Sequence, residues 1–216
     1  MVVNGHESAL NILVVEDNRG DFLLINDYLN ESLPECRVTG AKTFEEAREQ
    51  LMSGEFNIVL LDLTLPDKSG KELVREISRL VTTAPVIVLT GFSDKEFGPK
   101  AIQLGAADYV QKEDLTPSYL LKSITYNLER KKITAQLQKS EKNYRDLFSL
   151  SPIPMWVYDI ETLRFLQVNV AAVNHYGYSE SEFLGMTLKD IRPESEIPRL
   201  MKSIKFLMNK KDWRGK

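Results

Sequence analysis

Residues 56–70 read FNIVLLDLTLPDKSG, and this stretch indicates the fold class of the chain. An unbroken apolar run from Ile58 to Leu61 ends at Asp62. A run this short and this apolar is typical of a strand that is buried on both faces of a parallel sheet. Turn residues follow, and the helical spacing of apolar residues over 73–80 predicts a helix after them. Asp62 is therefore expected at the carboxyl end of a central strand, where open α/β sheets bind ligands.

Composition indicates a globular protein with two differently charged parts. Apolar residues make up 43% and charged residues 27% of the 216 residues, which is ordinary for a packed domain. The net charge is −9 over residues 1–114 and +6 over residues 115–216, which together give −3. The acidic part disfavours nucleic acid as a direct partner and suits a site that gathers cations, and the basic residues of the second part are scattered.

The sequence predicts neither a membrane segment nor a disulfide. No apolar run approaches the roughly 20 residues that span a bilayer. Cys36 is the single cysteine and has no internal partner. Both features favour a cytoplasmic protein, because free thiols persist in reducing compartments.

The apolar run before Asp62 is one of five. Runs of strand character over residues 11–15, 37–39, 58–62, 84–90 and 107–111 alternate with helical patterns. This alternation predicts an α/β fold with a doubly wound, five-stranded parallel sheet and right-handed crossovers.

The residues at the ends of these runs are chemically suited to one another. Glu16 and Asp17 follow the first run, Asp62 ends the third, Thr90 ends the fourth and Lys112 follows the fifth. The carboxyl ends of parallel strands share one edge of a sheet, so these side chains are expected to converge. Three crowded carboxylates repel one another unless a cation lies among them, and hard oxygen ligands suit Mg²⁺. The alternative is that each residue independently caps its own turn. In that case the occurrence of suitable residues at four strand ends would be a coincidence.

Residues 11–130 resemble the receiver domain of two-component response regulators. The resemblance rests on the acidic pair, the Asp in an apolar strand, the D-x-x-x-P turn of Asp62 and Pro66, the Thr and the Lys. It implies a flavodoxin-like fold with strand order 2-1-3-4-5. It also implies that Asp62 accepts phosphate from a phosphohistidine of a cognate histidine kinase or phosphotransfer protein.

The resemblance also implies a Mg²⁺ site. Its ligands would be Asp17, Asp62 and the backbone carbonyl of Thr64, with Glu16 assisting. No other cofactor is expected.

Three further roles follow from the same resemblance. Lys112 and Thr90 would assist catalysis at Asp62, and Thr90 and Tyr109 would form a switch that moves with the phosphate. A half-exposed aromatic residue that merely ends a strand is the alternative for Tyr109. Glu113 stands where the family usually has Pro, so the loop after Lys112 is expected to depart from the family's geometry.

A long helix is predicted over 116–148, because this stretch has no Gly and no Pro after Pro117. It either pairs in a homodimer or forms a solvated linker. Its expected seam is imperfect and consists of Leu121, Ile124, Leu128, Ala135 and Leu137. The predicted domains are a receiver over 8–128, a helical linker over 129–148 and a second module over 149–216.

The second module resembles the front half of a PAS sensory domain. Residues 155–159 and 165–169 read as a hairpin, with short helices after them. A PAS domain has five antiparallel strands and only two are expected here, so we expect the chain to be a fragment of a longer protein. His175 is read as a surface or cavity-wall residue rather than a haem ligand.

The sequence therefore predicts a phosphoacceptor of a two-component phosphorelay, which relays its state to a PAS or output region, as in the front part of a hybrid sensor kinase. No kinase catalytic domain is visible, so activity beyond self-phosphorylation and slow self-dephosphorylation is not expected. One alternative is a Mg²⁺-dependent phosphohydrolase that forms an aspartyl-phosphate, although that class carries a second Asp where this chain has Thr64. Another is an unphosphorylated docking or dimerisation module.

Overall fold

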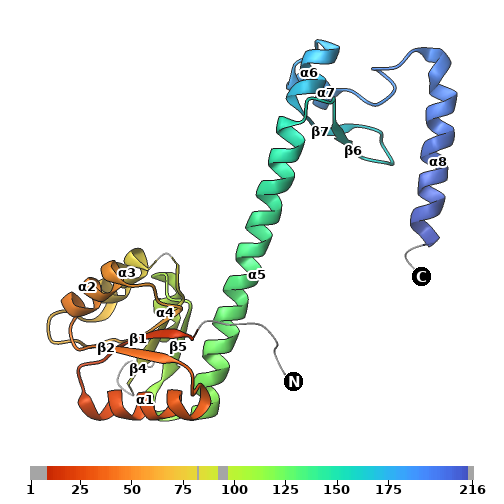
Figure 1. Ribbon diagram of the computed structural model, residues 1–216. Helices are drawn as coiled ribbons and strands as arrows, with labels where there is room; N and C mark the ends of the chain where they lie inside the picture. Colours follow the sequence, from red (N-terminus) through yellow and green to blue (C-terminus); the bar gives the residue numbers. More distant parts are fainter. Residues whose placement is uncertain (1–8, 82, 92–96, 214–216) are drawn as a thin grey trace. The chain divides into compact units, whose positions relative to one another are not determined.

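A computed structural model describes residues 9–81, 83–91 and 97–213, with side chains to residue 208 (Figure 1). The predicted domain ends at residues 8 and 216 lie outside the described residues. The chain divides into two compact units, Met1–Ala135 and Gln136–Lys216, and helix α5 contributes to both.

The first unit alternates strands and helices, as the sequence predicts. Its strands are β1 (Asn11–Val15), β2 (Arg37–Ala41), β3 (Ile58–Asp62), β4 (Val86–Thr90) and β5 (Asp108–Gln111). Its helices are α1 (Arg19–Ser32), α2 (Phe44–Ser53), α3 (Gly70–Leu80), α4 (Gly98–Gln103) and the first part of α5 (Pro117–Leu150).

The five strands form one parallel sheet in the order β2-β1-β3-β4-β5. In its register Val15 lies opposite Leu61, and Asp62 lies opposite Leu89. The ends of β1, β3 and β4 therefore meet along one edge. The predicted flavodoxin-like topology is confirmed.

Two apolar cores cover the two faces of the sheet. Alternate strand residues such as Leu13 and Leu61 pack against α2, α3 and α4, while Ile12 and Leu60 pack against α1 and α5. Figure 1 shows α2 and α3 on one side of the sheet and α1 with α5 on the other. All five residues of β3 are buried, which explains its unbroken apolar sequence.

Strand β2 is longer than predicted, and the start of α1 and the segment after β5 have defined local structure. Strand β2 runs two residues past Thr39 to Ala41. Helix α1 begins at Arg19 because the side chain of Asn18 accepts hydrogen bonds from the backbone N–H groups of Gly20 and Asp21. After β5 the chain forms a short 3₁₀ helix over Lys112–Asp114, and no cis peptide bond occurs among the described residues.

The second unit begins with the last turns of α5 and contains the predicted hairpin. Strand β6 (Trp156–Tyr158) pairs antiparallel with β7 (Phe165–Val168), and helices α6 (Val170–Tyr176), α7 (Glu180–Gly185) and α8 (Ile197–Trp213) follow. The rings of Trp156, Phe165, Tyr176 and Phe183 pack edge to face at the centre of this unit.

Asn169 organises the start of the second unit. Its buried amide nitrogen donates hydrogen bonds to the carbonyl oxygens of Phe148, Ser151 and Ile153. Its amide oxygen accepts from the backbone N–H groups of Met155 and Ala172. One side chain therefore ties the end of α5 to β6 and to the start of α6.

Helix α5 is continuous over the predicted stretch, but the apolar seam differs from the prediction. Ile124 is fully buried and Leu128 packs against the core of the first unit, so neither is free to meet a partner helix. At these two positions the face that was expected to pair covers the sheet instead, whereas Ala135 and Leu137 of the same predicted seam are exposed. Among the described residues, no helix is long and apolar enough to cross a membrane.

Candidate functional site

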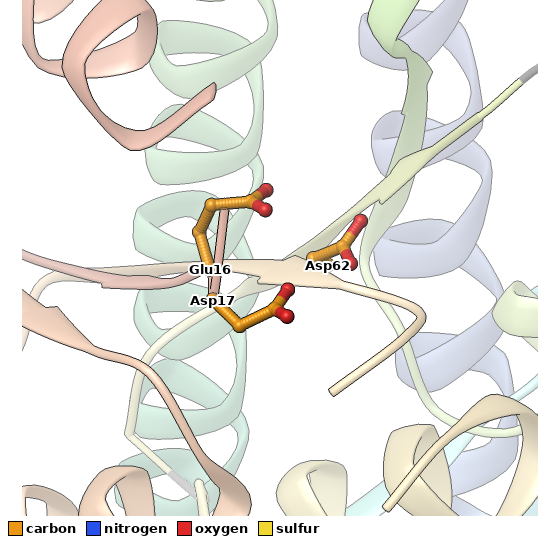
Figure 2. Close-up of side chains that lie close together, drawn as sticks. All are labelled: Glu16, Asp17 and Asp62. Atoms are coloured by element: carbon orange, nitrogen blue, oxygen red, sulfur yellow. The ribbon is translucent and has the colours of Figure 1, made fainter. Parts of the chain in front are cut away.

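Three carboxylates meet at the carboxyl edge of the sheet. Glu16 and Asp17 directly follow β1, and Asp62 is the last residue of the neighbouring strand β3. One oxygen from each lies within 4.8 Å of the others. Figure 2 shows the three side chains converging on a common space. The structure thus brings together the acidic residues that the sequence predicts for this edge.

Lys112 joins this group from the end of β5. Its ammonium nitrogen lies 2.8 Å from Oδ1 of Asp62 and 2.7 Å from Oε2 of Glu16. It also lies 2.8 Å from Oδ2 of Asp21, in the first turn of α1. Asp21 was not among the site residues predicted from the sequence. The position of Asp21 could have predicted its place in the site. It lies in the first turn of the helix that begins after the acidic pair, and this turn lies at the same edge of the sheet.

Burial shapes the charges of this cluster. Burial raises the pKa of the Glu16 carboxyl, and the nearby charge of Asp62 adds to this shift while the hydrogen bond from Lys112 opposes it. Burial also acts to lower the pKa of the Lys112 ammonium, but hydrogen bonds to Asp21, Asp62 and Glu16 outweigh it and raise that pKa. Lys112 is therefore a fixed positive charge in a site with excess negative charge.

The turn after Asp62 is held by its own backbone and by α2. The N–H of Thr64 donates to Oδ2 of Asp62 at 3.1 Å. Asp67 accepts hydrogen bonds from the backbone N–H groups of Phe44 and Glu45, at the start of α2. A carboxylate from this loop thus caps the preceding helix α2, which fixes the loop that carries Thr64.

Thr90 and Tyr109 lie on neighbouring strands next to this cluster. The buried Thr90 hydroxyl donates to the carbonyl oxygen of Val110 at 3.4 Å. The partly buried ring of Tyr109 packs on Gly98 at the start of α4, where a Cβ would lie 2.8 Å from Cγ of the ring and closer still to two other ring atoms. Only a glycine at position 98 leaves room for the ring in this place.

A polar network connects the start of β5 to α5. Oδ2 of Asp108 accepts hydrogen bonds from the Ser123 hydroxyl at 2.7 Å and from the Asn127 amide at 3.1 Å. Its Oδ1 accepts from the backbone N–H of Tyr109. Ser123 and Asn127 are buried, so this network fixes α5 to the strand that carries Tyr109. This network was not predicted from the sequence.

The oxygen donors fit a hard divalent cation. Mg²⁺ binds carboxylates and retains several waters, and the three converging carboxylates provide such a donor set at an edge that opens to solvent on the side of the exposed Asp17. The carbonyl of Thr64 as a further ligand stays a prediction, because the contact seen for Thr64 uses its N–H group.

Comparison with known families agrees with this geometry. Residues 12–125, more than half of the chain, match the model of the response regulator receiver domain. Residues 142–210 match a PAS domain model.

Individual relatives match the receiver part. The chain is 35% identical over 108 residues to the methanogenesis regulatory protein FilR1 of Methanothrix harundinacea, an overlap that covers 49% of this chain and 24% of the relative. It is 32% identical over 111 residues to the transcriptional regulatory protein CiaR of Streptococcus pneumoniae, covering 51% of this chain and 46% of the relative. The chain thus spans less than half the length of these curated relatives.

A solved structure of the same kind is similar along its whole length. The CheY-like response regulator receiver domain protein from Methanospirillum hungatei is 27% identical, with a TM-score of 0.53, and the match covers 59% of this chain and 99% of that one. Receiver domains bind Mg²⁺ at an acidic site and interact with a histidine kinase or phosphotransfer partner, and the acidic cluster is present here. The chain belongs to the family of response regulator receiver domains, with a PAS domain following the receiver.

Proposed function

We propose that this chain is a phosphoacceptor of a two-component phosphorelay and that Asp62 receives the phosphoryl group from a phosphohistidine. The observation that carries the proposal is the bridge from Lys112 to Asp62 and Glu16, with 2.8 Å and 2.7 Å contacts at the strand ends. A lysine held between an acceptor carboxylate and an acidic pair suits the transfer of a highly charged group.

The reaction is an in-line displacement at phosphorus. An Asp62 carboxylate oxygen forms the new O–P bond as the P–N bond to the donor imidazole breaks, and the electron pair of that bond stays on the imidazole. The Lys112 ammonium is positioned to neutralise oxygens of the transferring group. The N–H of Thr64, which already donates to Asp62, is near enough to bind a phosphoryl oxygen on the same carboxylate.

Asp17 and Asp62, with Glu16 assisting and the Thr64 carbonyl as a further ligand, are the residues we propose to hold Mg²⁺. When bound, the cation supplies positive charge at the phosphoryl oxygens and offsets the mutual repulsion of the carboxylates. Burial of Glu16 and its contact with Lys112 orient that carboxylate within the cluster.

We propose that Thr90 and Tyr109 report phosphorylation to the surface. Thr90 is at the edge of the site, and its hydroxyl bonds only weakly, at 3.4 Å, to the next strand. It can exchange this bond for one to a phosphoryl oxygen. Movement of Thr90 then leaves space for the Tyr109 ring to change position. The hydrogen bonds of Asp108 connect the backbone of Tyr109 to Ser123 of α5, so a change at Tyr109 can be transmitted to that helix.

The second unit is the proposed recipient of this signal. Helix α5 leads from the receiver to the PAS domain, and Asn169 fixes the end of that helix to the hairpin. We propose that the whole protein uses this arrangement as the front part of a sensor or hybrid kinase, with the cognate kinase as partner of the receiver.

Labelling of Asp62 tests the proposal. The chain is incubated with Mg²⁺ and acetyl phosphate, or with beryllofluoride, and the wild type is compared with Asp62→Asn. Asp62-dependent, slowly hydrolysed labelling supports the phosphoacceptor. Rapid turnover of phosphate esters indicates the phosphohydrolase, and the absence of any response to either reagent indicates the docking module. Asp27→Asn, on exposed α1 surface, is the matched control and is expected to label like the wild type.

A further inference from the structure

The ammonium group of Lys112 contacts three carboxylates at once. Its nitrogen lies 2.8 Å from Oδ1 of Asp62 and 2.7 Å from Oε2 of Glu16. The third contact, also 2.8 Å long, is with Oδ2 of Asp21. A lysine ammonium has three N–H donors, so these carboxylates occupy all of them. A phosphoryl oxygen can therefore bind Lys112 only by taking the place of one carboxylate.

The three carboxylates differ in how much it costs to release them. The side chain of Glu16 is 1% exposed and that of Asp62 is 11% exposed, whereas that of Asp21 is 42% exposed. A buried carboxylate that loses its counter-ion keeps a large desolvation penalty, while water solvates an exposed one. Glu16 is also held by the backbone N–H of Asn18, which donates to its Oε1. Asp21 is therefore the partner that Lys112 releases at the lowest cost.

Asp62 is not expected to give way while the transfer proceeds. It is the proposed nucleophile, and it keeps carboxylate charge until the O–P bond has formed. Release of Asp21 preserves the contact between Lys112 and Asp62 and frees one N–H for the incoming group. The backbone of Asp21 is fixed, because its N–H donates to Oδ1 of Asn18 at 3.3 Å in the cap of α1. Release thus needs rotation of one side chain and no movement of the helix.

We propose that Asp21 is a positioning residue for phosphoryl transfer. It holds the Lys112 ammonium before the donor arrives, and a phosphoryl oxygen takes its place on Lys112 as the transfer proceeds. This inference rests on the proposed function of Asp62 and deepens it, since Asp21 lies outside the set of residues proposed to hold Mg²⁺. Because the contact between Asp21 and Lys112 has to break first, Asp21 slows the phosphorylation of Asp62.

The rate of Asp62 labelling tests this exchange. The full chain is incubated with saturating Mg²⁺ and with acetyl phosphate far below saturation, and the initial rate of acyl phosphate formation is measured. Asp21→Asn keeps the size of the side chain and removes its charge. This variant is expected to label about threefold faster than the wild type, which corresponds to the loss of a partly exposed ion pair. Damage to the fold would change the rate in the opposite direction.

Two matched variants separate the exchange from a general effect of charge. Asp21→Glu keeps a carboxylate at the same place in α1 and is expected to label at the rate of the wild type. Glu113→Gln removes one negative charge from an exposed side chain that follows Lys112 in the chain. Glu113 is not among the three carboxylates that contact the ammonium, so this variant is expected to change the rate by less than about 1.5-fold, because water and salt screen its charge.

The outcomes distinguish failure of this inference from failure of the proposed function. A wild type that is not labelled, or labelling that persists in Asp62→Asn, would overturn both. If the wild type is labelled at Asp62, the inference alone is overturned when Asp21→Asn labels no faster than the wild type. The same conclusion follows when Asp21→Glu or Glu113→Gln accelerates labelling as much as Asp21→Asn.

Discussion

The ammonium nitrogen of Lys112 lies 2.8 Å from Oδ1 of Asp62. The same nitrogen contacts Glu16, whose side chain is 1% exposed, so a single cation balances the acceptor and the most buried carboxylate of the cluster. This relationship has a consequence for stability, because loss of one partner leaves buried like charges without a counter-ion.

Replacement of Lys112 by Met is therefore expected to destabilise the metal-free protein. The free energy of unfolding in urea should fall by about 2 kcal/mol, less than for a fully buried pair because Lys112 keeps some contact with solvent. Saturating Mg²⁺ should restore part of the loss by binding the folded state. Arg48→Met, which breaks an exposed ion pair with Glu45, should cost less than about 0.5 kcal/mol and should not respond to Mg²⁺. Equal losses in both variants would contradict the proposed charge balance.

The raised pKa of Glu16 predicts a pH dependence of a definite sign. Because burial raises this pKa above the ordinary value of 4.5, the folded chain binds more protons than the unfolded chain just above that pH. The stability that Glu16 contributes is full below pH 4.5 and is lost as pH rises through the folded-state pKa. We therefore measure the free energy of unfolding in urea without Mg²⁺ for the wild type and for Glu16→Gln. The value for the wild type minus the value for Glu16→Gln should fall as pH rises. The difference between wild type and Glu45→Gln should lack this slope, and a rising difference for Glu16→Gln would be inconsistent with the account.

Because Gly98 has no side chain, it is expected to leave the space into which the Tyr109 ring packs. Gly98→Ala should lower the free energy of unfolding by about 1 kcal/mol, since overpacking outweighs the gain in helix propensity. Gly185→Ala in α7 has open space around its Cβ position and should be neutral or stabilising. In a Tyr109→Ala background the cost of Gly98→Ala should disappear. Persistence of the cost there would show that the ring is not its cause.

Asn169 is expected to control the order of the second unit. Asn169→Ala leaves the carbonyl oxygens of Phe148 and Ile153 and the N–H of Met155 without their present partner, and should cost about 3 kcal/mol. Hydrogen exchange should accelerate over residues 150–176 and stay unchanged over the receiver sheet. Asn174→Ala, at an exposed position of α6, is the control and should leave exchange unaltered. If Asn169→Ala left hydrogen-exchange protection over residues 150–176 unchanged, Asn169 would not control the order of the second unit.

The sequence was sufficient to predict the sheet and most of the site, for a physical reason. Buried parallel strands are nearly all apolar, so the first polar residue after each apolar run marks the carboxyl end of a strand. In a parallel sheet these carboxyl ends lie along the same edge, which brings the polar residues together. Glu16, Asp17, Asp62 and Lys112 therefore were predicted to converge, and they do.

Other features depend on packing that a single stretch of sequence does not encode. Asp21 enters the site because of the direction in which α1 leaves β1, and Gly98 matters only because Tyr109 of another element packs on it. The predicted seam of α5 was wrong at Ile124 for a related reason. Apolar residues at helical spacing indicate a buried face, and they do not distinguish burial against the helix's own sheet from burial against a second chain.

The central claim is that Asp62 carries the phosphoryl group, and chemical trapping measures this most directly. After incubation with acetyl phosphate and Mg²⁺, borohydride reduces an acyl phosphate to homoserine at the modified residue, and peptide mass spectrometry locates it. The account predicts conversion at Asp62, none at Asp17, and a strong decrease in Lys112→Met. Conversion at another carboxylate, or undiminished acid-labile phosphate in Asp62→Asn, would contradict it.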